Sequence, residues 1–259
     1  MMGFDPDLET SFSILKGMAE AGADLIEVGF VFTDPMADGI SIQRAAERAL
    51  EAGASLRGSL DLVARFRQEN TETPVILMGY ANPVEQMGYL PFAQGMTAAG
   101  VDGAIIVDLP PEEDAPLREA FAKYDLSLIR LATPTTDDHR LTTVLEGVSG
   151  FVYYVSVTGV TGTKKIAAEA ANAAVARIKR ATHLPIAVGF GVREAEAAAA
   201  IARGADAVVV GSLFVDDVKA CVDAGRPEDA PARVAASVKA MSEAVRGARN
   251  GSARETLKA

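Results

Sequence analysis

One short phrase recurs three times and constrains the fold more than any other feature of the chain. Each copy reads as the end of a helix, a glycine, a small residue, an aspartate and an apolar run. The copies are AGADLIEVG (residues 21–29), AGVDGAIIVDLP (99–110) and RGADAVVVGS (203–212). A glycine just past a helix suits the left-handed cap position, and the apolar run after it is predicted to be a buried strand. The repeat therefore indicates a fold built from recurring helix–strand units.

Further apolar runs have the length of strands, and amphipathic helical patterns separate them. The predicted strands are residues 24–30, 74–80, 103–109, 126–132, 150–156, 185–191 and 207–211. Continuous apolar strands that alternate with helices are typical of a parallel sheet covered by helices. We predict an α/β fold, a (β/α)₈ TIM barrel. The alternative is an open doubly wound sheet, but no G-x-G-x-x-G joins a strand to a helix near the front of the chain.

A closed barrel of this kind needs an eighth strand, and only MMGF precedes the first predicted helix. Those residues are too few for a barrel strand of about five to six residues. We therefore expect the first strand to be largely missing, and an exposed strand edge at this seam would favour self-association. No linker divides the chain, so residues 1–247 are predicted to form a single domain, followed by a polar, frayed tail at 248–259.

The charge balance excludes some partners. The 259 residues carry 25 basic and 35 acidic side chains, a net charge of −10, with no basic block. This argues against a nucleic acid or an anionic membrane as the main partner. The single cysteine, Cys221, suits a reducing compartment, and the two histidines, His139 and His183, are too far apart to suggest a zinc site. No secretory leader or run of about 20 apolar residues is present, so we predict a cytoplasmic protein.

Carboxylates cluster around the first predicted strand. Barrel enzymes place their chemistry at the C-terminal ends of strands, where Asp38 and Asp108 are expected, while Glu27 lies within a strand. If Glu27 faces the barrel interior, loss of solvation raises its pKa and suits it to give and take protons. An equally good alternative is a buried acid paired with a cation. Asp38 and Asp108 could instead stabilise their own loops.

Glycines follow three consecutive strands near the end of the chain, at 159 and 162, at 189 and 191, and at 211 before Ser212. Glycine lets the backbone approach an anion closely, and the start of a helix offers free amides. We therefore predict a phosphate site, the alternative being tight turns alone. Tyr80, Tyr153 and Phe190 could line an aromatic pocket, although each could also be a core residue.

The stretch IEVGFVFTDPMADG…IQ resembles the signature of the tryptophan synthase alpha subunit family. The resemblance covers almost the whole chain and continues through LMGYANPV, GVDGAIIVDLPPEE, LATPTTDD, GFVYYVSVTGVTGTK, PIAVGFGVR and GADAVVVGS. It implies a (β/α)₈ barrel that cleaves indole-3-glycerol phosphate to indole and glyceraldehyde 3-phosphate, a carbon–carbon lyase of tryptophan biosynthesis. It also implies no cofactor of its own and no metal. The implied partner is a beta subunit that uses pyridoxal phosphate.

The resemblance also implies roles for individual residues. Glu27 matches the general acid–base, and Asp38 matches the aspartate that holds the indole N–H. The positions that match substrate-binding residues are Tyr80, Asp108, Tyr153, Thr161 and Phe190. The positions that match the phosphate-binding backbone are Gly162, Gly191, Gly211 and Ser212.

The chain departs from the family pattern at Phe4, Val31, Ile40, Leu213 and Phe214. The replacement of two prolines, by Val31 and Ile40, removes fixed backbone angles from the loop that carries Asp38. An alternative hypothesis is therefore an engineered or catalytically impaired barrel that acts as a scaffold or partner-binding subunit. A third is another phosphate-binding barrel enzyme, such as indole-glycerol-phosphate synthase, but the characteristic lysines of that enzyme have no counterpart at these strand ends.

Overall fold

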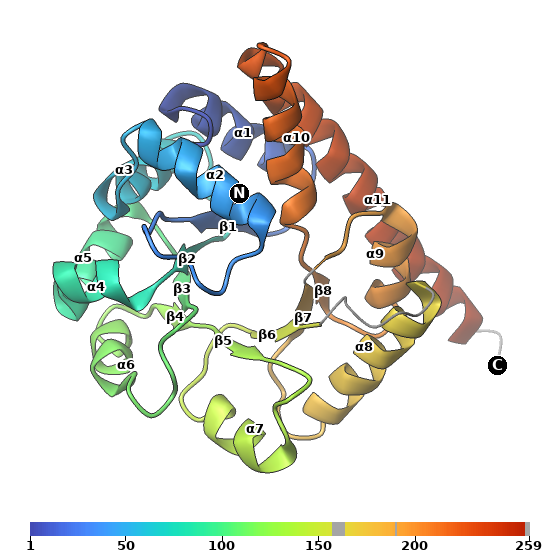
Figure 1. The fold of residues 1–259 in the computed structure, drawn as a ribbon. Coiled ribbons are helices and arrows are strands. Elements are labelled where there is room, and N and C mark those ends of the chain that lie inside the picture. Colours follow the sequence, from blue (N-terminus) through green and yellow to red (C-terminus); the bar gives the residue numbers. More distant parts are fainter. Residues whose placement is uncertain (157–163, 190, 257–259) are drawn as a thin grey trace.

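Helices surround a ring of parallel strands, as the sequence predicts (Figure 1). The computed structural model describes residues 1–156, 164–189 and 191–256. The strands are β1 (Ile26–Gly29), β2 (Val75–Gly79), β3 (Gly103–Ile106), β4 (Ser127–Leu128), β5 (Arg130–Ala132), β6 (Val152–Val155), β7 (Ile186–Gly189) and β8 (Ala207–Val208). The fold is an α/β TIM barrel, and its wall consists of two four-stranded parallel sheets, β1-β2-β3-β4 and β5-β6-β7-β8.

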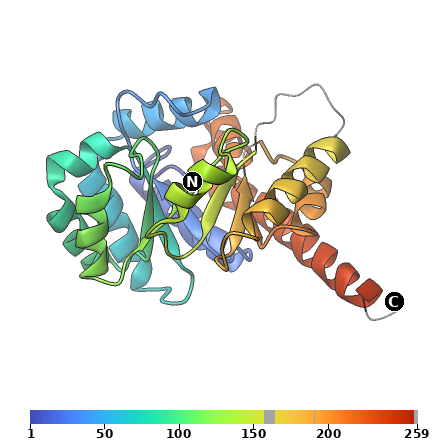
Figure 2. The same ribbon diagram turned by 90° about the horizontal axis from the view of Figure 1, so that it is seen from below.

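The helices lie outside the strands (Figure 2). They are α1 (Leu8–Glu20), α2 (Ile40–Glu51), α3 (Leu56–Arg67), α4 (Ala81–Met87), α5 (Tyr89–Ala99), α6 (Ala115–Ala122), α7 (Asp138–Leu145), α8 (Lys164–Ile178), α9 (Ala195–Ala202), α10 (Ser212–Asp223) and α11 (Ala230–Thr256), with a 3₁₀ turn at Pro227–Asp229. Helix α11 continues into the range predicted as a frayed tail. The proposed division of the chain at residue 247 stays a prediction. In the described part of the chain no helix is long and apolar enough to cross a membrane.

The predicted strand 126–132 is split in two. Its first half, β4, pairs with β3, and its second half, β5, pairs with β6. Ile129 lies between the halves, where its amide donates to the Ala104 carbonyl at 3.0 Å and its side chain is buried. The split therefore marks a change of pairing partner within one continuous strand of the wall.

The first strand is reduced to a single bridge, as expected from the few residues before α1. Met2 pairs in parallel with Gly29 of β1. The Gly3 amide donates to the Gly29 carbonyl at 2.9 Å, and the Gly29 amide donates to the Met1 carbonyl at 2.8 Å. Across the described residues, strand pairing does not join this segment to β8, so the barrel wall has a seam there.

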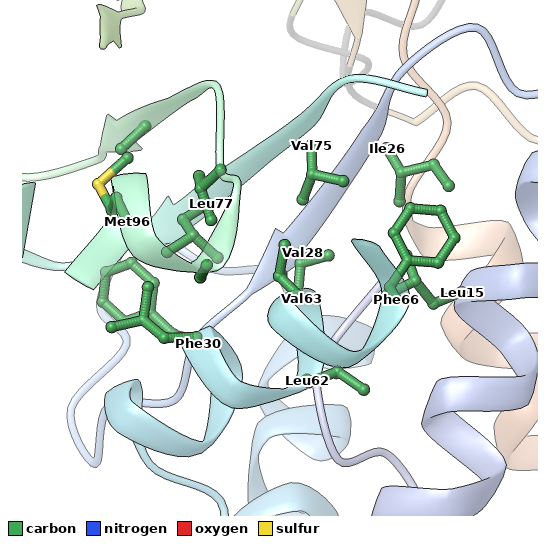
Figure 3. Close-up of a cluster of buried hydrophobic side chains, with 14 of the residues drawn as sticks. Leu15, Ile26, Val28, Phe30, Leu62, Val63, Phe66, Val75, Leu77 and Met96 are labelled. Carbon is green, nitrogen blue, oxygen red and sulfur yellow. The ribbon is translucent and has the colours of Figure 1, made fainter. Parts of the chain in front are cut away.

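Side chains alternate between two apolar layers along each strand. Ile26 and Val28 of β1, with Val75 and Leu77 of β2, pack outward against the helices (Figure 3). Between them in sequence, Ile76 faces the barrel interior and packs with Ile105, Ile129 and Tyr153, next to the half-buried Leu25. This two-residue period places Glu27 on the interior side of β1, because its neighbours Ile26 and Val28 face the helices.

The repeated aspartate has a structural role that explains its recurrence. Asp102 precedes β3, and its Oδ2 accepts the Val75 amide of β2 at 2.7 Å. Asp206 precedes β8, and its Oδ2 accepts the Ile186 amide of β7 at 2.8 Å. In each case the aspartate holds the amide of the residue opposite it in the preceding strand. The aspartate therefore fixes the register of two neighbouring strands at the N-terminal face of the barrel.

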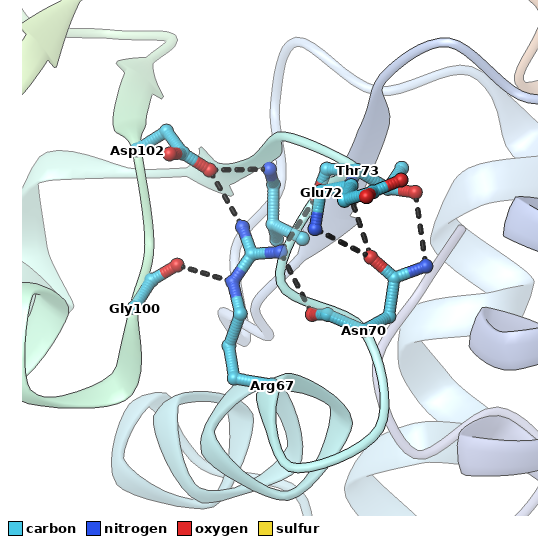
Figure 4. A network of polar contacts seen from close by, with 7 residues as sticks. Arg67, Asn70, Glu72, Thr73, Gly100 and Asp102 are labelled. Atoms are coloured by element: carbon cyan, nitrogen blue, oxygen red, sulfur yellow. Dashed lines mark hydrogen bonds and ion pairs between the residues drawn. The ribbon is translucent and has the colours of Figure 1, made fainter.

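A network around Asp102 extends this role to a helix (Figure 4). Arg67, at the end of α3, donates to Asp102 at 2.7 Å, to the Gly100 carbonyl at 2.7 Å and to the Thr73 carbonyl at 2.7 Å. One guanidinium thus connects a helix end to the entries of two strands. Its planar arrangement of N–H donors suits such multiple contacts.

Two of the three glycines in the repeat adopt the predicted left-handed backbone. The φ angles are 102° at Gly22 and 74° at Gly100. Gly204 is different, because its φ angle is not positive. A Cβ there would lie 2.6 Å from the Asn172 side chain, so close packing accounts for this glycine.

Candidate active site

Glu27 lies on the interior side of the barrel, as its position in the strand predicts. Its Oε1 atom is buried and has no hydrogen-bond partner among the described residues. Burial raises the pKa of Glu27 to about 7, while the nearby amino group of Met1 opposes this shift. The alternative of a salt-bridged structural acid gains no support, since the described residues include no Lys or Arg side chain paired with Glu27. A carboxyl group with a pKa near neutrality can both donate and accept a proton.

Asp38 lies in the loop between β1 and α2, and Tyr80 holds that loop. Tyr80 follows β2 directly, is only 3% exposed, and its hydroxyl oxygen accepts the Ala37 amide at 3.0 Å. The hydroxyl group also hydrogen-bonds with the Asp38 carboxylate. Burial raises the pKa of Asp38, and the bond to Tyr80 opposes that shift. The observed contacts of Tyr80 support the position of Asp38, and its predicted role in substrate binding stays a prediction.

The Tyr80 hydroxyl stays protonated. Burial is the main reason that its pKa rises to about 12, and the charge of Asp38 adds to the rise. A protonated phenol can donate to the Asp38 carboxylate while it accepts the Ala37 amide. The ring of Phe32 packs against the ring of Tyr80 at a centroid distance of 5.5 Å. Phe32 could not be predicted from the sequence, since no pattern links an aromatic residue of this loop to Tyr80.

Asp108 contacts the backbone at the end of a neighbouring strand. Its Oδ1 accepts the amide of Ala81, the first residue of α4, at 2.7 Å. The carboxylate thereby caps α4, with the side chain exposed. This contact is structural, although it holds the start of α4 and not the loop of Asp108 itself, and a role in substrate binding stays a prediction.

Tyr153 of β6 faces the interior near Glu27. It is 7% exposed, and its pKa is raised by burial and then by the charge of Glu27. Its hydroxyl lies over Gly189 of β7, where a Cβ would come within 2.4 Å of the oxygen. Gly189 therefore leaves room for the tyrosine. Close packing against Tyr153 is thus the reason for one of the glycines at the strand ends.

The predicted phosphate site is partly described. Gly191 follows β7 with a φ angle of 75°, and Gly211 precedes the first residue of α10, Ser212. A Cβ at Gly211 would meet no atom of the described residues within 4 Å, so the backbone is accessible at this point before α10. The amides in the first turn of a helix lack intrahelical partners and favour an anion. The remaining predicted positions, Thr161, Gly162 and Phe190, lie outside the described residues.

The residues that depart from the family pattern fall into two groups. Phe4, Val31 and Phe214 are buried in the core, and the first two pack with Met2 below α2. Leu213 is half-buried against the core, whereas Ile40 is 64% exposed at the start of α2. None of the five belongs to the interior cluster around Tyr153. The bulky replacements therefore pack away from the interior face that carries Glu27.

An ion pair anchors α2, which follows the Asp38 loop. Arg48 donates from Nε and Nη2 to the two oxygens of Asp5, at 2.7 and 2.8 Å. Asp5 is only 2% exposed, and its burial raises its pKa while Arg48 opposes the shift. The Gln43 side chain then connects the helix to the loop by donating to the Asp38 carbonyl at 2.8 Å. These contacts restrain the Asp38 loop where it enters α2, in addition to the contact that Tyr80 makes with the loop.

No cluster of three or more candidate metal ligands occurs among the residues that the structure describes. The candidate site is thus a set of carboxyl groups and aromatic side chains at the interior and the C-terminal ends of the strands, with helix amides near β8.

Comparisons with known proteins agree on one family. The family model described as tryptophan synthase alpha chain matches residues 1–246. The tryptophan synthase alpha chain of Caulobacter sp. (strain K31) is 53% identical over 249 residues, which cover 96% of this chain and 90% of that protein. The corresponding protein of Phenylobacterium zucineum (strain HLK1) is 55% identical and covers 96% and 89%.

Solved structures give the same result. The crystal structure of tryptophan synthase subunit alpha from Legionella pneumophila str. Paris matches with a TM-score of 0.88 and 37% identity, covering 95% of this chain and 91% of that one. A crystal structure of tryptophan synthase from M. tuberculosis matches with a TM-score of 0.83 and 33% identity, covering 95% and 90%.

Proposed function

The chain belongs to the tryptophan synthase alpha chain family, and we propose that Glu27 and Asp38 carry its reaction. The reaction is the retro-aldol cleavage of indole-3-glycerol phosphate to indole and glyceraldehyde 3-phosphate, the alpha-subunit step of tryptophan biosynthesis. The observation that supports this assignment most directly is the buried, unpaired Oε1 of Glu27, on a group whose pKa lies near 7.

The cleavage needs two proton transfers around one carbon–carbon bond. A proton is added to the indole ring carbon that carries the side chain, and a proton leaves the adjacent side-chain hydroxyl. The electron pair of the broken bond then restores the indole ring, and the hydroxyl carbon becomes the aldehyde of glyceraldehyde 3-phosphate. Glu27 can serve both transfers, because its neutral and ionised forms have similar free energies near neutral pH.

Asp38 would stabilise the positive charge that develops when the ring carbon is protonated. Its carboxylate would accept the indole N–H, a charge-assisted hydrogen bond that strengthens as the ring becomes cationic. The bonds from Tyr80 and Gln43 to this loop support a fixed position for the carboxylate. Such a position matters, because a group that is already oriented needs no reorganisation during the reaction.

The phosphate group would bind at the end of the barrel near β7 and β8. Gly191, Gly211 and the first turn of α10 supply the described part of this site. We include Thr161, Gly162 and Phe190 in the proposal on the strength of the family resemblance alone. The remaining proposed substrate-binding residues are Tyr80, Asp108 and Tyr153.

The proposed partner is a tryptophan synthase beta subunit. The loop between β1 and α2 and the start of α2 present Met36, which is 87% exposed, and Ile40. Exposed apolar side chains on a loop next to the active site suit a protein contact. Self-association at the seam and a cytoplasmic location stay predictions, the latter favoured by the single cysteine and the biosynthetic role.

The test is indole release from indole-3-glycerol phosphate, measured with and without an added beta subunit. Turnover that increases on addition of the beta subunit would support both the reaction and the partner. A folded protein that releases no indole under either condition would refute the lyase proposal. That result would favour the second candidate, a catalytically impaired barrel that binds a partner, to which the bulky departures from the family pattern point.

A further inference from the structure

An ion pair joins the two chain segments that carry the described part of the proposed phosphate site. These segments follow β7 and β8, which are neighbours in the same parallel sheet (Figure 1). The chain leaves β7 through Gly191 and leaves β8 through Gly211, which directly precedes α10. Beyond these glycines, Arg193 donates from Nη2 to Oδ2 of Asp216 at 2.5 Å. A pair of opposite charges therefore lies next to both halves of the site.

The backbone that carries Arg193 is anchored. Gly191 turns the chain with a φ angle of 75°, and the next side chain, Val192, is 5% exposed. Val192 belongs to the same apolar core as Ala198 and Ile201 of α9. The Arg193 side chain follows directly and is half exposed, so its guanidinium reaches α10 from a fixed point.

Asp216 lies four residues beyond Ser212, the first residue of α10. Residues four apart lie on the same face of a helix, about 6 Å apart along its axis, and side chains tilt toward the helix N-terminus. The Asp216 carboxylate thus carries a negative charge close to the first-turn amides that would bind phosphate. It also interacts with the same partial positive charge of the helix end that favours an anion. Without a counter-charge, Asp216 would repel a phosphate group.

We propose that Arg193 sets the affinity of this site for a phosphate ester by neutralising the charge of Asp216. At physiological ionic strength, charges are screened over about 8 Å, so a carboxylate about 6 Å from the start of the helix acts on a bound phosphate. With the pair intact, the two charges cancel at this distance, and the amides of α10 bind the anion unopposed. Neither side chain needs to touch the substrate. The inference rests on the proposed function, from which it takes the phosphate site.

The test compares three variants in the binding of glycerol 3-phosphate, measured by titration calorimetry. Arg193→Gln leaves the Asp216 charge in place and should weaken binding by about fivefold. Asp216→Asn removes that charge and keeps Arg193 positive, so it should strengthen binding by about threefold. The double variant carries no charge at either position and should bind like the unchanged protein. Loss of a merely structural contact would instead weaken binding in both single variants.

A matched control makes the same change of charge at the other end of α10. Arg226 follows α10 and pairs with Asp229, and Arg226→Gln also lowers the net charge by one. The 12 residues of α10 span about 18 Å, which is more than twice the screening length, so this variant should bind glycerol 3-phosphate unchanged. In about 0.5 M salt, the affinities of Arg193→Gln and Asp216→Asn should approach each other. In indole release, these two variants should change KM and leave kcat unaltered, because the phosphate group does not react.

The possible outcomes separate this proposal from the lyase proposal. Weaker binding in both single variants would assign the pair a structural role and overturn the proposal. Unchanged binding in both, or no binding of glycerol 3-phosphate by the unchanged protein, would overturn it as well. The expected order of affinities without any indole release would refute the lyase proposal alone. Indole release with equal KM values in all variants would refute the role of Arg193 alone.

Discussion

The protonation of Glu27 links the chemistry of the site to the stability of the fold. In the folded chain its pKa lies near 7 because of burial, against 4.5 in the absence of that environment. The unfolded state therefore loses this proton at a lower pH than the folded state does. Between these two values the ionised unfolded form is favoured, so Glu27 lowers the free energy of unfolding as the pH rises.

We predict that Glu27→Gln removes this pH dependence. Relative to the unchanged protein, the variant should gain up to about 3 kcal/mol in its free energy of unfolding between about pH 5 and about pH 8. The measurement is urea denaturation of both proteins at the two pH values. If the free energies of unfolding of the two proteins differ by the same amount at both pH values, the burial assigned to the Glu27 carboxylate is wrong.

Tyr80 offers a second test at the scale of single atoms. Tyr80→Phe removes the hydroxyl that accepts the Ala37 amide and contacts Asp38. We expect kcat/KM for indole release to fall by about tenfold, with a loss of about 1 kcal/mol in the free energy of unfolding. The matched control is Tyr89→Phe, which removes an exposed bond to Glu85 on α4 and should leave kcat/KM unchanged. Equal kinetic effects in the two variants would argue against a positioning role for Tyr80.

The sequence predicts some of these residue roles better than others. The interior orientation of Glu27 follows from the two-residue period of a strand, because Ile26 and Val28 are apolar neighbours on the opposite side. The contacts of Tyr80 and Asp108 could not be predicted in the same way. Their partners, Ala37 and Ala81, lie on other loops, and only the folded barrel brings them within hydrogen-bonding distance.

Among the strands and helices, the three copies of the repeated aspartate should contribute unequally to the free energy of unfolding. Asp102→Ala leaves the Val75 amide without its acceptor and removes one of the acceptors of the Arg67 guanidinium, so we expect a loss of about 2 kcal/mol in the free energy of unfolding. Asp24→Ala removes only an exposed ion pair and should cost less than about 0.5 kcal/mol. Denaturant unfolding of the two variants makes the comparison. Equal losses would contradict the role assigned to the repeat.

The strand and helix pattern is largely predictable, and the exceptions have physical reasons. All seven predicted strands contain observed strands, because each is a continuous apolar run bounded by turn residues. The break at Ile129 was not predicted, since it reflects a change of pairing partner and not a change of composition. The helical conformation of α11 up to Thr256 does not follow from the sequence pattern, because a polar sequence near a chain end carries little information about its packing.

At the scale of the whole molecule, the seam and the active site lie on the same strand. Glu27 of β1 lines a cavity along the seam, while the loop that follows β1 carries Asp38. The single bridge at Met2 could be predicted by counting the residues before α1, but the cavity could not, because it depends on how β8 and α11 approach β1.

We infer that this barrel cleaves indole-3-glycerol phosphate through the Glu27 carboxyl group. The most direct measurement is the rate of indole formation by the unchanged protein and by Glu27→Gln, with both folds verified by circular dichroism. We predict measurable indole formation by the unchanged protein and a rate lower by about 10²-fold or more in the variant, which keeps the shape of the side chain without its proton. Indole formation by Glu27→Gln at a rate close to that of the unchanged protein would contradict the account.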